Sequence, residues 1–277
     1  MALICAVSAS GSPGVTSTVL GMALCWPRPV LLVEADPTAG SAILAGRFRG
    51  LQSHSGLIDL VMAQRSGVLA EALPRVVMEV PDTTVSILTG SRTHAQAAGL
   101  SRIWEPLLGV LRGMTATGED VLVDAGRLGL DGSPTPLIAD ADLTLLVLRS
   151  NLRALAAAKS WADSLGADAV PGHSVQAVVV GENRPYRAAD VARTLGLPVL
   201  GTVAWDPRRA EVFADGADKP VPRFGGATAA DRAFAASGYL RSIRALGEAA
   251  RKVATSTGEG SLLREMIAAR IGEEARR

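Results

Sequence analysis

The chain has 277 residues, 48% of them hydrophobic, and its 28 Lys and Arg against 27 Asp and Glu leave a formal charge of +1. That length and hydrophobic content allow one large folded domain and exclude a disordered chain. The even charge gives no electrostatic reason to expect a nucleic-acid or anionic-membrane surface, and no apolar run reaches the ~18 residues of a membrane-spanning helix.

Two cysteines, Cys5 and Cys25, sit in apolar runs and are expected to be buried thiols in a reducing compartment. Apolar residues begin at Ala2 with no basic region before them, so no secretory signal is predicted. We therefore expect a cytoplasmic protein.

Short apolar runs alternate with longer helical patterns up to about residue 255. The runs are rich in Val, Leu and Ile without polar alternation, as expected of strands covered on both faces. They are Leu3–Val7, Val30–Val33, Val85–Leu88, Val121–Val123, Leu143–Leu148, Val175–Val180 and Val199–Val203. Helices are expected at Thr16–Cys25, Leu100–Met114, Leu152–Leu165, Arg187–Leu195 and Ala229–Ala254. This order predicts an α/β fold with a doubly wound, mostly parallel sheet of seven or eight strands.

Two segments fit the alternation less well. Residues 36–82 show no strand pattern and short helices at most. The segment Pro207–Ala230 is rich in Pro, Gly, Asp and Arg, which predicts a surface loop.

A third departure lies near the C-terminus. The stretch Ser256-Thr-Gly-Glu-Gly260 predicts a break in the chain. We therefore divide the sequence into an α/β domain over residues 1–255 and a linker with a C-terminal helical tail over residues 256–277. The tail carries Leu263, Ile267 and Ile271 at helical spacing and equal numbers of acidic and basic residues, which favours a packing or partner helix over a membrane helix.

The first candidate binding residues lie in the loop between the first strand and the first helix, Ala9-Ser-Gly-Ser-Pro-Gly-Val-Thr-Ser-Thr18. Glycine-rich loops at this place hold phosphates with backbone N–H groups and the helix N-terminus. Against the P-loop pattern G-x-x-x-x-G-K-[ST], Gly14 and Thr16 match, whereas Ala9 replaces the first Gly and Val15 replaces the lysine. A plain tight turn explains this half-match about as well.

Polar residues follow several later strands. Glu34 and Asp36 end the second strand, Asp124 ends a further strand, Asn183 follows Val178–Val180, and Asp206-Pro207 follows Gly196–Val203. Each also has a structural interpretation, because Asp before Pro starts turns and Asn before Arg-Pro can initiate a helix.

In this order the segments resemble the ParA/MinD family of deviant P-loop ATPases over roughly residues 3–250. The likeness is closest to divergent members associated with Tad pili and related secretion systems (CpaE/TadZ-like). The sequence Gly-Ser-Pro-Gly-Val-Thr of this chain resembles the variant loop of those members. The resemblance implies a P-loop NTPase fold with ATP and Mg²⁺ as ligands.

The resemblance also implies a role for each matching residue. It places the cofactor in a loop cradle made by Gly11, Ser12, Pro13, Gly14, Val15, Thr16 and Ser17. Thr16 and Asp124 are placed on Mg²⁺, and Asp36 at the catalytic position that orients the attacking water. Asn183 and the Asp206-Pro207 loop are placed at the adenine.

Both lysines of the family's loop are missing. Ser10 stands where a lysine reaches the partner subunit's phosphates, and Val15 stands at the P-loop lysine. The lysines of the whole chain are Lys159, Lys219 and Lys252, so no small alignment shift restores either position. Losing one preorganised donor costs ~3–4 kcal/mol in such a site. Arg47 and Arg49 are the arginines considered as substitutes, without a geometric reason for either. We expect weak or no ATP hydrolysis. Two states of the loop stay open: it still holds ATP–Mg²⁺ through its backbone, Thr16, Asp124 and Asn183, or it is retained as structure and binds no nucleotide, which is slightly favoured.

The favoured function is therefore that of a degenerate ParA/MinD-like positioning, assembly or scaffold factor for a secretion or pilus-type machine. Its partner would be the ATPase of that machine or a related component, and any membrane association would be peripheral, through that partner. A homodimer is implied as well, with a nucleotide-independent contact through the tail.

Two alternatives stay open. One is an active ATPase with ATP-dependent dimerisation, acting in partitioning or septum placement. The other is an α/β enzyme that binds a different phosphorylated ligand at Gly11–Ser17.

Two further groups of residues are interpreted structurally. Acidic neighbours favour a solvated face for Arg149, Arg153, Arg208 and Arg209. Packing is expected for Trp26, Trp104, Trp161 and Trp205.

Overall fold

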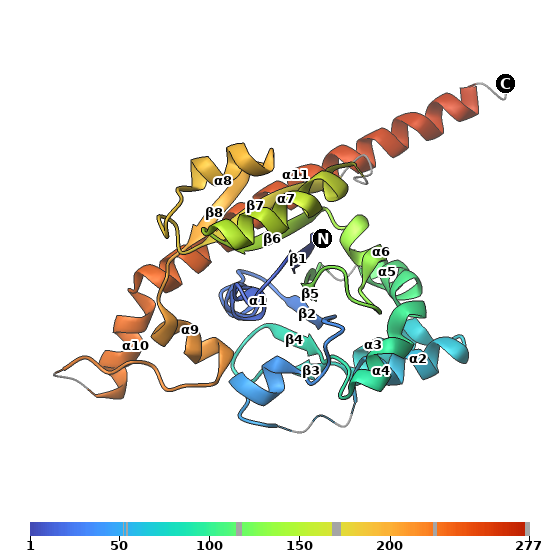
Figure 1. Ribbon diagram of the computed structural model, residues 1–277. Helices are drawn as coiled ribbons and strands as arrows, with labels where there is room; N and C mark the ends of the chain where they lie inside the picture. The colour runs from blue at the N-terminus through green and yellow to red at the C-terminus, as the bar shows by residue number, and fades with distance from the viewer. Residues whose placement is uncertain (52, 54, 115–117, 168–172, 224–225, 275–277) are drawn as a thin grey trace.

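The computed structural model describes residues 1–51, 53, 55–114, 118–167, 173–223 and 226–274, and side chains as far as residue 257 except those of residues 94, 98 and 167. Eight strands form one sheet in the order β3-β4-β2-β5-β1-β6-β7-β8. All neighbouring pairs are parallel except β3 and β4 (Figure 1). The strands are β1 (Leu3–Ser8), β2 (Val30–Glu34), β3 (Met78–Glu79), β4 (Val85–Leu88), β5 (Asp120–Arg127), β6 (Leu143–Arg149), β7 (Ser174–Val180) and β8 (Val199–Val203).

Helices cover both faces of this sheet, which confirms the predicted doubly wound α/β fold. One face packs against α1 (Val15–Leu24), α9 (Pro207–Ala214), α10 (Ala227–Ala235) and α11 (Gly238–Glu274). The other packs against α2 (Leu57–Arg65), α3 (Leu69–Val76), α5 (Trp104–Gly113), α6 (Thr135–Ala139), α7 (Leu152–Ala167) and α8 (Ala188–Leu195). Shorter turns of helix are η1 (Ile43–Arg47), α4 (His94–Ala98) and η2 (Gly99–Arg102).

The sequence pattern of β1 explains the two layers. Leu3, Cys5 and Val7 belong to one apolar cluster, and the intervening Ile4 and Ala6 belong to the other. Successive side chains of a strand point to opposite faces, so an uninterrupted apolar run is what a strand covered on both sides requires.

Three predictions about local structure are wrong. The segment predicted as a loop from Pro207 contains α9, because Asp206 caps the helix by accepting from the Arg209 N–H and Pro207 occupies the first helical position. The predicted break at residues 256–260 lies inside α11, since a glycine lowers helix stability by about 1 kcal/mol without forcing a turn. The supposedly strand-free segment contains the short edge strand β3.

The predicted helix over Ala229–Ala254 is divided into α10 and α11. The division occurs at Ser237, whose hydroxyl accepts from the Leu240 N–H 3.1 Å away as an N-cap of α11.

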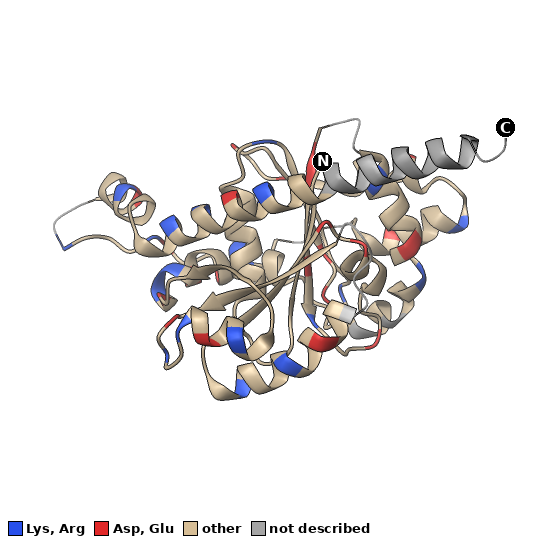
Figure 2. Ribbon diagram, turned by 90° about the horizontal axis from the view of Figure 1, so that it is seen from above, with Lys and Arg blue, Asp and Glu red and all other residues tan. Residues whose placement is uncertain are grey.

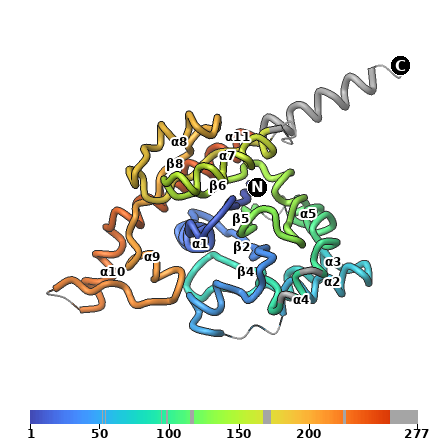
Figure 3. The backbone as a smooth tube through the Cα atoms, viewed as in Figure 1, coloured from blue at the N-terminus to red at the C-terminus, as the bar shows by residue number. Residues whose placement is uncertain are grey.

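Figure 3 traces how distant segments meet on the α1 face. The stretch that includes η1 lies beside α9. Arg49 joins them, because its guanidinium donates to the Gly216 carbonyl at 2.9 and 3.0 Å and to the Asp218 carboxylate at 2.7 Å. Arg49 is therefore a link between two surface segments.

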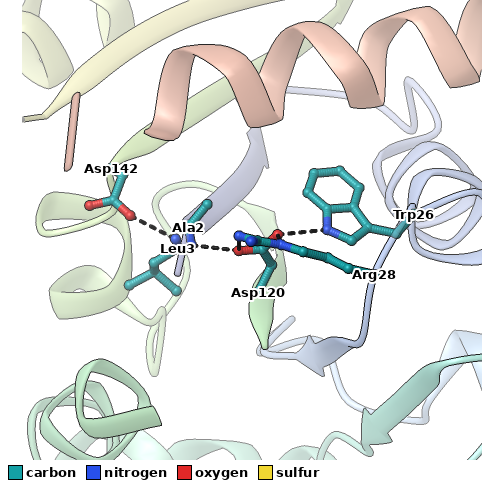
Figure 4. Close-up of polar contacts among 6 residues, drawn as sticks. All are labelled: Ala2, Leu3, Trp26, Arg28, Asp120 and Asp142. Atoms are coloured by element: carbon teal, nitrogen blue, oxygen red, sulfur yellow. Dashed lines mark hydrogen bonds and ion pairs between the residues drawn. The ribbon is translucent and has the colours of Figure 1, made fainter. Parts of the chain in front are cut away.

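At the amino-terminal edge of the sheet, two buried carboxylates hold the start of β1 (Figure 4). Asp120 accepts from the Ala2 N–H at 2.6 Å, from Trp26 Nε1 at 2.9 Å and from two nitrogens of Arg28 at 2.5 Å. Asp142 accepts from the Leu3 N–H at 2.7 Å. These bonds satisfy backbone donors that the sheet itself leaves unpaired.

Candidate functional site: a phosphate loop at the carboxyl edge of the sheet

The loop Ala9–Gly14 connects the carboxyl end of β1 to α1. β1 lies between β5 and β6, where the strand order reverses direction along the chain, and ligands of doubly wound folds bind at such a point. Gly11 and Gly14 have positive φ angles of 65° and 98°, and Gly14 is the residue before the first helical turn. The unpaired N–H groups of that turn make the loop suited to an anion.

The loop presents fewer donors than a complete P-loop. Val15 is 6% exposed and packs in the apolar cluster that contains Ile4 and Ala6. Pro13 is buried and has no N–H to offer. Ser10 is half-buried and lines a cavity on the β6 side of the loop. The Val15 side chain therefore serves core packing and offers no charge to the loop.

Thr16, Asp36 and Asp124 line one small cavity of about 30 Å³ together with Glu34. Asp124 is 2% exposed and lies in register with Glu34 on the neighbouring strand β2. The structure thus brings together the residues predicted for the metal and for catalysis, Thr16, Asp124 and Asp36.

Asp124 carries the strongest electrostatic perturbation of this group. Burial raises its pKa to about 7, the charges of Asp36 and Glu34 add to the rise, and a hydrogen bond with Thr16 opposes it. A bound cation would remove that cost by favouring the ionised carboxylate.

Glu34 has a structural task. It is buried, accepts from the Ile43 N–H at 3.1 Å and from the Ser41 hydroxyl, and so ties the segment after β2 to the sheet. Burial raises its pKa, against the lowering effect of these hydrogen bonds.

Asp36 is held by two contacts. Its Oδ1 accepts from the Thr38 N–H at 2.8 Å and from the Thr38 hydroxyl at 2.7 Å. Its carboxyl group lies against Gly126, where a Cβ would come within 2.2 Å of Asp36 Cγ. Gly126 also has a φ of 64°, so both its missing side chain and its backbone angle suit this position.

Asn183 is not brought to the loop. It is exposed, has a φ of 63°, and donates its N–H to the Tyr186 carbonyl at 2.8 Å. Asn tolerates the left-handed conformation, which accounts for its residue type in this turn. It is absent from the residues lining the cavities at the loop, whereas Asp206 lines one of them.

A cavity of about 200 Å³ adjoins the loop on the α9 side. Trp205, 38% exposed, forms part of its wall, and the guanidinium carbons of Arg149 and Arg184 lie over its ring at 5.0 and 5.3 Å from the centroid. Tyr239 is buried on the same wall, and burial raises its pKa to about 12 despite a hydrogen bond with Ser17.

Sequence reasoning missed Arg149 and Trp205. Arg149 is exposed, as expected of a solvated face, and its Nη2 also donates to the Ser12 carbonyl in the loop at 2.9 Å. Its one sequence signal was its place as the last residue of an apolar strand. The adjacency of that strand to β1 is a fact of topology.

The residues present fit a magnesium nucleotide. Mg²⁺ keeps several waters and phosphate oxygens as ligands, so the Thr16 hydroxyl and one carboxylate, Asp124, are a sufficient protein donor set. Within the described ranges no three or more His, Cys, Asp and Glu side chains form a metal cluster. Among the residues that the structure describes, no helix is long and apolar enough to cross a membrane. Lys, Arg, Asp and Glu are spread over helices across the molecule (Figure 2).

The fold is that of the ParA/MinD type of P-loop NTPases. A ParA family ATPase from Chlorobium tepidum matches with a TM-score of 0.66 and 14% identity, over 89% of this chain and 97% of its own. The cell division ATPase MinD from Pyrococcus furiosus matches at 0.64 and 18%, over 92% and 100%. The septum site-determining protein MinD of Pyrococcus horikoshii, complexed with Mg-ADP, matches at 0.63 and 18%, over 93% and 99%.

Two curated proteins are similar to this chain in sequence. They are the uncharacterized proteins Rv3660c and MT3760 of Mycobacterium tuberculosis strains H37Rv and CDC 1551, each 30% identical over 217 residues. The alignment covers 78% of this chain and 58% of each relative, so the chain spans little more than half their length. No protein-family model matches the chain.

Proposed function

We propose that this protein is a ParA/MinD-like positioning or assembly factor that binds ATP and Mg²⁺ at the loop and hydrolyses the nucleotide weakly or not at all. The observation that carries the proposal is Val15, which is buried in the core at the place of the P-loop lysine. Phosphoryl transfer depends almost entirely on positioning and charge stabilisation, so a site without that cation retains binding more readily than catalysis.

The proposal assigns the phosphates to the backbone of Gly11–Ser17, with Val15 contributing only its main chain. Thr16 and Asp124 would hold Mg²⁺, which when bound neutralises phosphate charge. Asp206, at the cavity beside the loop, and Asn183, in the exposed turn after β7, are assigned to the adenine side.

The geometry around Asp36 supports the proposed weak turnover. Asp36, the residue proposed to orient the attacking water, already has one carboxylate oxygen bonded to Thr38. A general base must accept a proton from its water in the reactive complex. Asp36 would therefore have to leave Thr38 or use its other oxygen, and the loop lacks a lysine to offset the phosphate charge.

We further propose a secretion or pilus-type machine as the cellular setting, with a CpaE/TadZ-like role, a homodimer, a cytoplasmic location and a protein partner from that machine. Support comes from the sequence resemblance of the variant loop. In such a role the fold supplies a recognition surface. The role of residues 256–277 as a contact segment belongs to the same proposal, on an α11 that continues through residue 255 without a break.

Genetic complementation tests the proposal. The gene is deleted in its native host and replaced by wild type or by Asp36→Ala, with purified variants compared by circular dichroism. We expect Asp36→Ala to restore assembly and localisation of the machine as wild type does. A folded Asp36→Ala protein that fails to complement would contradict a non-hydrolytic role and favour the active ATPase.

A further inference from the structure

Arg149 is a cationic side chain that contacts the loop. It ends β6, the neighbour of β1, and lines both the 200 Å³ cavity on the α9 side and the 450 Å³ cavity on the β6 side of the loop. Its Nη2 donates to the Ser12 carbonyl at 2.9 Å. A guanidinium has five N–H donors, so this contact leaves others to face an anion.

Trp205 fixes the orientation of this guanidinium. Arg149 lies 5.0 Å from the centroid of the indole ring, and Arg184 lies 5.3 Å from it. Gly181, with a φ of 74°, permits the arrangement, because a Cβ there would come within 3.2 Å of both Trp205 and Arg184. Stacking on an aromatic ring pre-orders an arginine that would otherwise lose rotamer freedom on binding.

The charges around the loop favour an anion on the β6 side. The cavity there is lined by Arg149 and Arg153 and by no carboxylate among the described residues. On the α9 side the acidic lining residues are Asp206 and Glu211, and Asp206 is paired with Arg209.

We infer that Arg149 is a phosphate-binding cation of this site and supplies, from the β6 side of the loop, charge for binding but not the contact of the missing P-loop lysine with the transferring phosphoryl group. The ligand is an oligophosphate, the tail of a nucleotide, held by the loop Gly11–Thr16. On binding, the guanidinium turns its free N–H groups to phosphate oxygens and forms the bidentate contact that arginine makes with phosphate. This inference rests on the proposed nucleotide binding at the loop.

Calorimetry with ATP–Mg²⁺ and with inorganic tripolyphosphate tests it, on the full chain and on Arg149→Ala. Arg208→Ala is the matched control, because Arg208 is exposed, carries the same charge and does not line the cavities at the loop. We expect Arg149→Ala to weaken both ligands by about tenfold or more and Arg208→Ala to change them less than twofold. Arg149→Lys should recover part of the loss, and Arg149→Gln replaces the alanine variant if that one is misfolded.

Trp205 fluorescence gives an independent readout. Tripolyphosphate should change the emission of wild type as the stacked Arg149 turns its free N–H groups to the phosphates, and the change should disappear in Trp205→Phe. If wild type binds neither ATP–Mg²⁺ nor tripolyphosphate, both the proposed nucleotide binding and the role of Arg149 are wrong. If wild type binds and Arg149→Ala binds equally well, only the role of Arg149 is wrong.

Discussion

Replacing Asp120 by alanine should be among the most destabilising single changes in this chain. The carboxylate is fully buried and accepts from the Ala2 N–H, from Trp26 Nε1 and from two nitrogens of Arg28 (Figure 4). It joins the start of β1, the segment after α1 and the start of β5. Those are the elements on which the loop at the other edge of the sheet is built.

The magnitude follows from what the variant leaves behind. The Ala2 amide and the Trp26 indole are buried and would lose their acceptor, at about 1–3 kcal/mol each. Arg28 is 38% exposed at its side chain and regains water, so its loss adds little. Together with the removed side-chain volume, Asp120→Ala should lower the free energy of unfolding by about 3–5 kcal/mol.

The contribution of Asp120 should depend on pH. Burial tends to raise its pKa, but the bonds from Arg28, Trp26 and Ala2 prevail and hold the pKa below its ordinary value of 3.8. A lowered pKa in the folded state stabilises above the unfolded value and is lost as pH falls through the folded value. The stability difference between wild type and Asp120→Asn should therefore be constant near neutral pH and shrink below pH 3.8.

Urea unfolding followed by far-UV circular dichroism measures the effect at pH 7. Asp131→Ala, at an exposed carboxylate, is the control and should change the free energy of unfolding by less than about 0.5 kcal/mol. If Asp120→Ala lowers the free energy of unfolding by less than about 1 kcal/mol, the reasoning is refuted. So small a loss would mean that the Ala2 amide and the Trp26 indole still have hydrogen-bond partners in the variant.

Three further predictions concern the site and the tail. Asp124→Asn should stabilise the ligand-free protein by up to about 4 kcal/mol at pH 8, because a folded-state pKa near 7 makes the wild type lose stability as pH rises from about 4 to about 7. Denaturation of both proteins at pH 5 and pH 8 measures this gain, and an equal gain at the two pH values would contradict the prediction. Gly126→Ala should have a much lower melting temperature than the control Gly67→Ala. Both glycines have a positive φ, but only at Gly126 would a Cβ clash with the Asp36 carboxyl group. Similar melting temperatures of the two variants would refute the clash. If the proposed dimer forms through the tail, deletion of residues 257–277 should halve the mass measured by light scattering, and an unchanged mass would exclude that contact.

The sheet was predictable because its signal is local. Seven apolar runs, from Leu3–Val7 to Val199–Val203, correspond to seven of the eight strands in the described part of the chain. A strand buried on both faces can be recognised from its own apolar run, without knowing which strand it pairs with. The two-residue β3 lacks such a run. The helix α9 was missed because its proline and charged residues resemble a loop, although Asp206-Pro207 is also a helix-start signal.

The sequence could predict only those site residues that directly follow a strand. Asp36 and Asp124 follow apolar strands, and the loop with Gly11 and Gly14 follows β1, so the sequence locates all of them at one edge. The contact of Arg149 with Ser12 spans 137 positions and depends on the adjacency of β6 and β1. No local pattern contains that order.

The same reason explains why Arg49, considered as a substitute for the lysine, binds the Gly216 carbonyl instead. Proximity along the chain to a strand end does not decide which side chain reaches the loop. The packing of α9 beside η1 decides it.

Single-turnover hydrolysis of ATP–Mg²⁺ by excess protein tests most directly whether this loop has lost its chemistry. Phosphate release by wild type is compared with release by Asp36→Ala and with buffer alone. We predict that wild type releases phosphate no faster than Asp36→Ala, because the loop lacks the lysine that would stabilise the transferring phosphoryl group. Release by wild type that Asp36→Ala abolishes would contradict this and identify a working ATPase.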